Sequence, residues 1–349
     1  MKAITIEPKR PHSARLEDVP DPPVSDGSVL VEAIAVGVCG TDAEMVAGKY
    51  GWAPPGRTRL VLGHESLGRV IDPGSSGMLK AGDLVAGIVR RPDPVPCPNC
   101  AVGEWDMCRN GKYTERGIKQ LDGFMSERWR IEPEYVMRID RSLGLLGVLL
   151  EPTTVVTKAW EQVARVGQRA FWEPQVALVT GAGPIGLLAA LLGRQRGLEV
   201  HVLDRMESGP KPELVRALGA TYHSGAVTDV GIEPDVIIEC TGVGQVIADS
   251  IRVIGAGGVV CLTGVGSGGR TSGLTTADVA AEMVLGNNVV LGSVNANKRH
   301  WYKASEALAR ADRAWLERLI TRREQPADFA RALERREQDI KVVVEFAAA

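Results

Sequence analysis

Thiol, imidazole and carboxylate side chains occur at separate points in the first 151 residues. Cys39 follows an apolar, β-branched segment, His64 and Glu65 are adjacent, and Glu151 precedes a proline. Zinc accepts these donor types, and a catalytic zinc needs three of them together with an open coordination position. Each residue also has an ordinary structural explanation, namely a buried core thiol, a hydrogen-bonded turn histidine or a solvated carboxylate. The residue types alone leave both interpretations open.

Three further cysteines lie within a short, proline-rich segment. Cys97, Cys100 and Cys108 have little apolar sequence nearby with which to form a core, so they are arranged more like metal ligands than like a secreted disulfide framework. This arrangement favours a second, structural zinc. The remaining two cysteines, Cys240 and Cys261, lie on predicted central strands, where a small core side chain is the simpler explanation.

A glycine-rich turn separates a predicted strand from a predicted helix in the second half of the chain. Val176–Thr180 is typical of a strand buried on both faces, residues 181–186 read Gly-Ala-Gly-Pro-Ile-Gly, and residues 187–196 form an apolar helix. The three glycines permit a tight turn, approach of a pyrophosphate to the backbone, and packing of helix on strand. The helix amides and dipole would face the phosphates. The residues predicted to bind a dinucleotide here are Gly181, Gly183, Pro184, Ile185 and Gly186.

An acidic residue ends the next predicted strand, Glu199–Leu203. Asp204 lies about twenty residues beyond the glycine turn, where a carboxylate holds the ribose hydroxyls of the cofactor. Because that carboxylate repels a 2′-phosphate, NAD is favoured over NADP. Arg205 follows directly and offers stacking on adenine or pairing with a phosphate, so NADP is not excluded.

Length, composition and net charge limit the classes of protein to which the chain can belong. The chain has 349 residues, enough for two domains, and 44% hydrophobic residues, which is typical of a globular protein. Its formal net charge of −2 gives no electrostatic reason to expect a nucleic acid or an anionic membrane as partner. The N-terminal segment lacks an apolar core of signal-peptide length, and the apolar segments are interrupted by Gly, Pro or charge. We therefore predict a cytoplasmic protein.

The predicted elements change character near residue 153. Strands are expected at residues 2–6 and 28–38, within a first part that is β-rich and loop-rich. Beyond residue 153, strands and helices alternate as in a doubly wound parallel sheet. The further predicted elements are a helix at 212–218, a strand at 236–240, a helix at 246–254, a strand at 258–264, a helix at 303–321 and a strand at 339–346.

Taken together, the motifs resemble those of the zinc-dependent medium-chain dehydrogenases over nearly the whole chain. The matching motifs are C-G-T-D at 39–42, G-H-E-x-x-G at 63–68, G-D-x-V at 82–85 and the cofactor turn at 181–186. Within that family the chain is most similar to the microbial glucose (aldose) 1-dehydrogenases. That similarity is carried by V-R-R-P at 89–92, G-E-x-D-M-C at 103–108, G-x-Y-T-E-R-G-I at 111–118 and G-S-V-N at 292–295.

The resemblance implies an α/β fold in which a Rossmann doubly wound parallel sheet adjoins a GroES-like, β-rich catalytic domain. We expect the catalytic domain at residues 1–152, the dinucleotide-binding domain at 153–292, and a return segment at 293–349 that completes the catalytic domain. Relatives form dimers or tetramers by joining the edges of their Rossmann sheets. The apolar residues 289–294 are the predicted edge of a homo-oligomer such as a homotetramer.

The resemblance also implies roles for the first group of donors. Cys39, His64 and Glu151 would hold the catalytic zinc, and Glu65 would act as a fourth or alternating ligand. Thr41 matches the hydroxyl that passes the substrate proton outward. In many relatives the relay ends at a histidine, but the matching region of this chain has none, so Asp42 and Glu44 are the alternatives considered.

Relatives with a structural zinc bind it through four cysteines. Cys97, Cys100 and Cys108 match the second, third and fourth of these, and the first position falls at Pro94, which cannot bind metal. Either the neighbouring Asp93 supplies an oxygen or the site is weakened or empty. We predict a bound structural zinc.

The implied activity is the NAD(P)-linked, zinc-dependent oxidation of an aldose at C1 to its lactone, with D-glucose as the leading substrate. Glu115, Glu151 and Asn295 would contact the sugar, and Thr241 and Asn295 the cofactor. Arg90 and His300 are weaker candidates, since a solvated charge or a helix-start residue explains them equally well. Two alternatives remain: a polyol, aminocyclitol or secondary alcohol dehydrogenase of the same family, and a cofactor-binding protein without activity.

Overall fold

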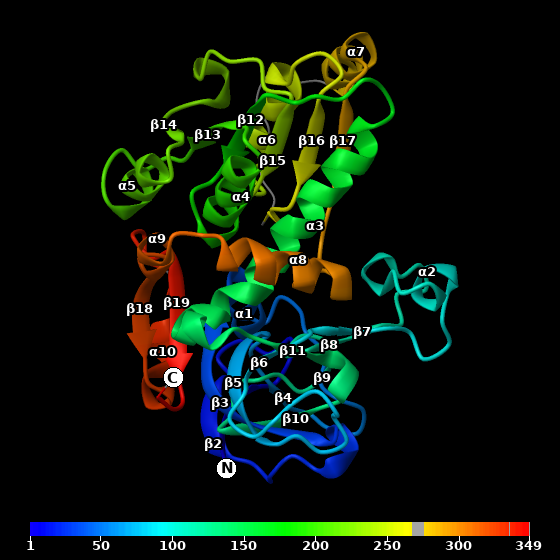
Figure 1. Cartoon of the computed structure of the whole chain (residues 1–349), viewed down its shortest axis with the longest axis vertical. Helices are drawn as coiled ribbons and strands as arrows, with labels where there is room; N and C mark the ends of the chain where they lie inside the picture. Colours follow the sequence, from blue (N-terminus) through cyan, green and yellow to red (C-terminus); the bar gives the residue numbers. More distant parts are fainter. Residues whose placement is uncertain (267–275, 335, 349) are drawn as a thin grey trace. The chain divides into compact units, whose positions relative to one another are not determined.

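The computed structural model describes residues 1–266, 276–334 and 336–348. The chain divides into two compact units (Figure 1). The first unit contains Met1–Glu151 and Ala296–Ala349, and the second contains Pro152–Asn295. None of the described helices is long and apolar enough to cross a membrane.

The first unit is built on three sheets. The largest has the strand order β11-β6-β5-β3-β19-β18, with β10 paired to β3. Its strands are β3 (Val29–Val38), β5 (Glu65–Asp72), β6 (Leu84–Gly87), β10 (Arg128–Ile131), β11 (Val136–Arg138), β18 (Ile320–Glu324) and β19 (Lys341–Glu345). The two smaller sheets contain β1 (Lys2–Ile6), β2 (Arg15–Asp18) and β4 (Leu60–Val61), and β7 (Arg90–Arg91), β8 (Thr114–Arg116) and β9 (Gln120–Leu121).

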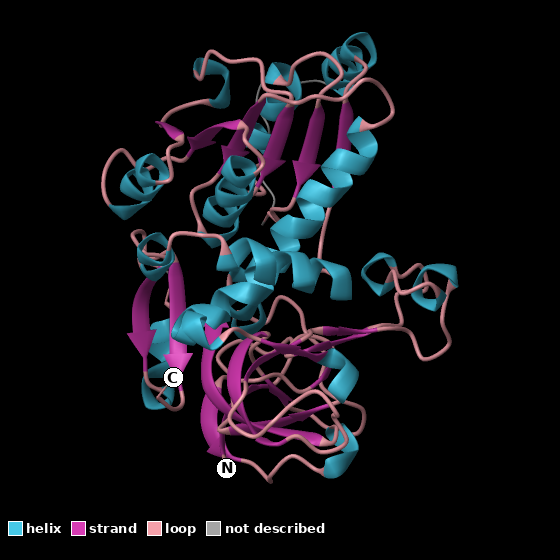
Figure 2. Ribbon diagram, viewed as in Figure 1, coloured by secondary structure: helices cyan, strands magenta, loops and turns pink. Residues whose placement is uncertain are grey.

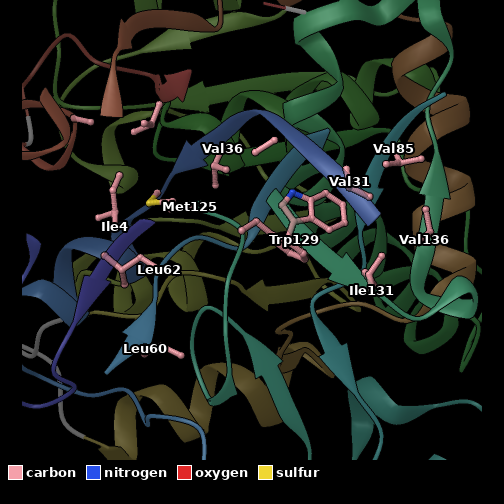
Figure 3. Close-up of a cluster of buried hydrophobic side chains, with 14 of the residues drawn as sticks. Ile4, Val31, Val36, Leu60, Leu62, Val85, Met125, Trp129, Ile131 and Val136 are labelled. Carbon is pink, nitrogen blue, oxygen red and sulfur yellow. The ribbon is translucent and has the colours of Figure 1, made fainter. Parts of the chain in front are cut away.

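The C-terminal strand β19 pairs antiparallel with β3, so the end of the chain completes a sheet that begins near the N-terminus. On its other side β3 pairs with β5. The core beneath these strands is apolar and closely packed (Figure 3), and the rings of Phe124 and Trp129 meet edge to face at 4.8 Å. Residues at the ends of β3 and β5 are thereby fixed by a buried scaffold.

Short helices connect these strands. They are α1 (Gly40–Val46), α2 (Pro98–Ala101), α8 (Lys298–Ala309), α9 (Arg313–Glu317) and α10 (Phe329–Leu333). The 3₁₀ segments within the described residues of both units are η1 (Val24–Asp26), η2 (Trp105–Met107), η3 (Pro133–Tyr135), η4 (Arg141–Leu149), η5 (Val227–Asp229) and η6 (Pro326–Asp328).

The predicted single helix at 303–321 is wrong. The structure has α8, a break, α9 and the start of β18 in that stretch. The carboxylate of Asp312 accepts the backbone N–H groups of Ala314 and Trp315 at 2.7 and 3.3 Å, which starts a new helix instead of continuing the first. The following residues pair with β19, a long-range contact that helical periodicity does not contain.

The second unit is a six-stranded parallel sheet with the order β14-β13-β12-β15-β16-β17 (Figure 2). Its strands are β12 (Val176–Thr180), β13 (Glu199–Leu203), β14 (Thr221–His223), β15 (Val236–Glu239), β16 (Val259–Leu262) and β17 (Val289–Gly292). Its helices are α3 (Leu150–Gly167), α4 (Pro184–Gln195), α5 (Pro210–Ala217), α6 (Gly244–Val253) and α7 (Thr276–Gly286). The strand order reverses between β12 and β15, as in doubly wound folds. The predicted α/β class, a parallel sheet together with a β-rich domain, is confirmed.

Helix α4 lies so close to its preceding turn that a side chain at Gly186 has no room. A Cβ there would come within 1.7 Å of the Gly181 carbonyl oxygen. We expect Gly186→Ala to lower the free energy of unfolding by about 1–3 kcal/mol and to weaken dinucleotide binding. Chemical denaturation and dinucleotide titration, both followed by tryptophan fluorescence, measure the two effects.

Gly183→Ala is the matched control, because a Cβ at Gly183 meets no atom within 4 Å. This variant should keep its stability while losing dinucleotide affinity, since the methyl group stands where the backbone is predicted to approach the pyrophosphate. Equal stability of the two variants would contradict this account of the turn.

Candidate active site

The ends of two neighbouring strands bring three potential metal ligands together. Cys39 directly follows β3, His64 directly precedes β5, and Glu65 is the first residue of β5. One ligand atom from each residue lies within 4.8 Å of the others, and Cys39 Sγ is 3.0 Å from His64 Nε2. Strand pairing therefore converts residues 25 positions apart in the chain into one thiol, imidazole and carboxylate cluster.

Asp42 supports this cluster from the first turn of α1. Its Oδ2 accepts the Cys39 backbone N–H at 3.0 Å, and its Oδ1 lies 3.5 Å from His64 Nδ1. Asp42 is completely buried, and burial raises its pKa against the opposing pull of His64. A carboxylate behind the second ring nitrogen is the usual support of a metal-binding histidine. Because Asp42 is committed to these two residues, it is a poor exit for a substrate proton.

The surroundings of His64 attract positive charge. Burial lowers its pKa, but the effects of the neighbouring Cys39 and Asp42 outweigh burial and raise it well above the ordinary value. Glu151, in the first turn of α3, acts in the same direction from slightly farther away, outside the tight three-atom cluster. Burial raises the pKa of Glu151 to about 7, against the opposing effect of His64. An excess of buried negative groups fits the binding of a divalent cation such as zinc.

Glu65 has a partner that the sequence motifs did not reveal. Lys341 on β19 donates to Glu65 Oε1 at 2.7 Å and Oε2 at 2.5 Å, and also lies 3.4 Å from the Val38 carbonyl oxygen. Both side chains are at most 3% exposed, so the pair is dry. Gly37 makes room for it, since a Cβ there would lie 2.0 Å from Glu65 Oε2. Glu65 is thus held away from solvent and beside Cys39 by a residue 276 positions later.

Thr41 lies one residue into α1 and connects the cluster to a tyrosine. Its backbone N–H donates to Cys39 Sγ at 3.2 Å, and its side chain acts on the pKa of the Tyr50 phenol in the lowering direction. Tyr50 is partly exposed and packs against Trp52 with 6.2 Å between ring centroids. Burial raises the pKa of Tyr50 to about 12. The phenol therefore stays protonated at neutral pH and can both accept and donate a hydrogen bond.

The second cysteine group also comes together. The thiols of Cys97, Cys100 and Cys108 lie within 4.8 Å of one another. The Asp93 carboxylate is outside this group, because its Oδ1 accepts the Val95 backbone N–H at 2.9 Å and its Oδ2 accepts the Asn110 side chain at 2.8 Å. The three thiols fit a zinc site and leave one coordination position for another ligand. Binding of that zinc by Asp93 as the fourth ligand stays a prediction.

Glu115 and Arg90 form a buried pair on neighbouring strands. Arg90 donates through Nε and Nη2 to Glu115 Oε1 at 3.0 and 2.9 Å, and it is only 4% exposed, so it is no ordinary solvated charge. His300 is buried in the first turn of α8, where its Nδ1 accepts the backbone N–H of Asn297 at 3.1 Å. His300 therefore serves as a helix-start residue, one of the two explanations left open for it.

In the second unit, the predicted cofactor residues meet at the carboxyl ends of β12, β13 and β15. Asp204 Oδ2 accepts the Ala182 backbone N–H at 2.7 Å, inside the glycine turn. A Cβ on Gly181 would lie 3.0 Å from the Thr241 methyl group, so Thr241 borders the same turn. The buried carboxylate of Glu239, which sequence reasoning missed, accepts the backbone N–H of Thr241 at 2.6 Å. This edge is where doubly wound sheets bind ligands.

The two other predicted cofactor residues of this unit differ in their settings. Arg205 is exposed. Asn295 has a left-handed backbone conformation, with φ at 60°, and the preceding carbonyl of Val294 accepts the Lys158 side chain at 2.8 Å. Lys158 is 1% exposed, so a buried lysine anchors the segment that carries Asn295.

Comparison with known families accounts for most of the chain. The family model described as alcohol dehydrogenase GroES-like domain matches residues 25–141, and the one described as glucose dehydrogenase C-terminus matches residues 144–346. The second match alone covers more than half of the chain.

Individual proteins match over the whole length. The glucose 1-dehydrogenase of Methanocella arvoryzae is 38% identical and covers 100% of both chains, and glucose 1-dehydrogenase 2 of Vulcanisaeta moutnovskia is 40% identical and covers 99% of both. Among solved structures, the glucose dehydrogenase of Haloferax mediterranei in complex with NADP, Zn and gluconolactone is 33% identical. It has a TM-score of 0.91 and covers 100% of both chains.

The buried pair of Glu65 and Lys341 yields a test of the cluster. Lys341→Met leaves a buried carboxylate without a partner, and we expect it to lower the free energy of unfolding of the zinc-free protein by about 3–5 kcal/mol. Urea denaturation measures the loss. The double variant Glu65→Leu/Lys341→Met, which leaves no lone charge, should regain most of it. A double variant as unstable as Lys341→Met would show that lost packing, and not the lone charge, causes the effect.

Proposed function

The chain belongs to the zinc-dependent medium-chain dehydrogenases, and from that membership we propose that it oxidises an aldose at C1 to the lactone, with D-glucose as the leading substrate. It is an NAD(P)-dependent dehydrogenase. The observation that carries the proposal is the Cys39, His64 and Glu65 cluster with its Asp42 support, in a chain similar over its whole length to glucose 1-dehydrogenases.

We propose that Cys39, His64 and Glu151 hold the catalytic zinc and that Glu65 is its alternating ligand. Bound there, zinc supplies a Lewis acid that lowers the pKa of the C1 hydroxyl. Asp42 lies behind the ring of His64, and Lys341 holds the Glu65 carboxylate in place. Lys341 already interacts with the Glu65 carboxylate. A metal that bound Glu65 would therefore compete with Lys341 for the same negative charge.

Cofactor binding rests on the carboxyl edge of the parallel sheet. The glycine turn would receive the pyrophosphate, Asp204 the ribose hydroxyls, and Thr241 and Asn295 the rest of the dinucleotide, which supplies the hydride acceptor. Asp204 favours NAD, but Lys211 Nζ lies 3.9 Å from its carboxylate and Arg205 is exposed beside it. These two cations would partly offset the repulsion of a 2′-phosphate, which keeps NADP as a second cofactor.

A sugar-binding site needs polar groups that are shielded from water and held in fixed orientations. We propose that Glu115 accepts hydrogen bonds from sugar hydroxyls, with Asn295 as a second contact and Glu151 as a third. The Arg90 guanidinium holds the Glu115 carboxylate from one side through two hydrogen bonds. A carboxylate fixed in this way discriminates between hydroxyl patterns better than a mobile one.

The proton released from the C1 hydroxyl needs an exit, and we propose that it leaves through Thr41 and Tyr50. Thr41 Oγ takes the proton and passes its own to the Tyr50 oxygen, and Tyr50 passes its proton to water. The effect of the Thr41 side chain on the pKa of Tyr50 and the partial exposure of Tyr50 support this route. Asp42 is fully buried, and Glu44 is paired with Lys49 at 3.3 Å. The proposed route therefore does not pass through either carboxylate.

We also propose that the protein forms a homo-oligomer through β17, the edge strand of the parallel sheet. Val289, Val290 and Leu291 on that strand are only half-buried, and an unpaired apolar edge is a ready site for strand pairing. Val290→Lys should shift the oligomer toward smaller species in analytical ultracentrifugation.

A cytoplasmic location stays a prediction, supported by six cysteines that are all free.

The first measurement is reduction of NAD and NADP by the purified protein with a panel of aldoses, polyols, cyclitols and simple alcohols, before and after treatment with a chelator. We expect turnover with glucose or its close epimers, loss of at least about 90% of the rate on zinc removal, and recovery on zinc addition. Turnover confined to polyols or cyclitols would move the substrate class and favour the alternative within the same family. No turnover with any of them would contradict the enzymatic proposal.

The proton route predicts that Tyr50→Phe lowers kcat about tenfold and leaves the KM for the sugar nearly unchanged. Small amine or imidazole buffers should restore part of the rate, because they can take the proton from Thr41 directly. Tyr135→Phe, which removes the hydroxyl of another half-buried tyrosine, is the control and should behave as wild type. A Tyr50→Phe enzyme with unchanged kcat would exclude the route through this phenol.

A further inference from the structure

The segment at residues 92–113, which we call the cysteine lobe, projects between β7 and β8 (Figure 1). Hydrogen bonds within the lobe connect its segments around the three thiols. The Asn99 side chain donates to the Met107 carbonyl oxygen at 2.6 Å, and the Cys108 backbone N–H donates to the Trp105 carbonyl oxygen at 3.1 Å. Helix α2 and segment η2 therefore move as one piece, and Cys108 directly follows η2.

The inner end of the lobe makes two buried hydrogen bonds to other parts of the first unit. The Asp106 carbonyl oxygen accepts Arg90 Nη1 at 3.1 Å, and Asp106 Oδ1 accepts the Asn297 side chain at 2.8 Å. Asp106 is 4% exposed and Asn297 is 2% exposed. Water cannot readily replace these bonds, so displacement of Asp106 leaves buried donors unpaired.

The guanidinium of Arg90 links the lobe to the proposed sugar contact. Its Nη1 binds Asp106, while its Nε and Nη2 bind Glu115, and its plane stacks 3.7 Å above the ring of Tyr113. Because a guanidinium is planar and rigid, a shift at one end is transmitted to the other. The position of Asp106 therefore sets the position of the Glu115 carboxylate.

A second connection runs from the same turn to the start of α8. Glu104 forms a bidentate ion pair with Arg299, at 2.7 and 2.9 Å, and Glu104 Oε2 also accepts the Asn297 side chain at 3.3 Å. Asn297 is the N-cap of α8. The turn at residues 104–106 thus holds both the sugar-binding carboxylate and the beginning of the helix that follows Asn295.

We propose that the cysteine lobe is a positioning element for the sugar site, with Asp106 and Glu104 as its positioning residues, so that a metal held by its three thiols sets the affinity for the sugar. This inference rests on the proposed function, because it assumes that Glu115 contacts the substrate. It gives the three-thiol site a role in substrate affinity.

The test compares steady-state constants of three variants. Asp106→Ala keeps the backbone carbonyl that binds Arg90 but removes the side-chain bond to Asn297 that holds this turn in place, so it should raise the KM for the sugar about tenfold and change kcat less than twofold. Asp106→Asn, whose amide oxygen can accept the same hydrogen bond, should restore the wild-type KM. Asp339→Ala is the control, because it removes a half-buried carboxylate that is paired with Arg322 at 2.6 Å, just before β19 and outside the cysteine lobe. A KM raised equally in Asp106→Ala and Asp339→Ala, or unchanged in Asp106→Ala, would overturn the proposal.

Hydrogen exchange supplies a readout that does not depend on turnover. Cys100→Ser should lower the zinc content of the purified protein and increase amide exchange at residues 90–91, 113–116 and 297–301, but not at residues 84–87. Glu104→Gln should increase exchange at 297–301 alone. Unchanged exchange in both variants would overturn the coupling. If the wild-type protein oxidises no sugar, the proposed function fails, while the exchange experiment still decides whether the lobe controls these segments.

Discussion

The buried ion pair between Glu65 and Lys341 is the constraint on which the first unit depends. It joins the start of β5 to the start of β19 across the end of β3, and Gly37 leaves the space that the carboxylate occupies. Two buried charges of opposite sign must stay in contact, because separating them would leave each charge buried without a partner. The pair therefore fixes the register of the C-terminal strand and places a carboxylate beside Cys39 and His64.

Three donors of the proposed zinc site are each held by a second group. Asp42 supports His64, the Thr41 backbone N–H donates to Cys39, and Lys341 holds Glu65. Such supports orient the ligands before a metal arrives, which lowers the cost of binding it. Acidic side chains and a thiol surround His64 and raise its pKa, which suits a site for a cation. The cluster is thus organised for a metal by residues that are not themselves ligands.

The same principle recurs elsewhere in the chain. Glu239 organises the loop that carries Thr241, Lys158 anchors the segment before Asn295, and Asp106 holds Arg90, which in turn holds Glu115. In each case a buried polar group fixes a residue proposed to bind cofactor or substrate. Buried polar networks of this kind specify one arrangement because every partner must be satisfied.

The sequence by itself determined the fold class, the glycine turn with its strand and acid, and the residue types of both metal-ligand groups, because these depend on local periodicity and short spacings. It failed on residues 303–321, where the capping carboxylate of Asp312 and pairing with β19 replace a continuous helix. Only the tertiary structure decided that Lys341 faces Glu65 and that Asp106 reaches Arg90. These contacts join segments whose proximity follows from sheet pairing, register and packing, and local sequence patterns carry no record of long-range register.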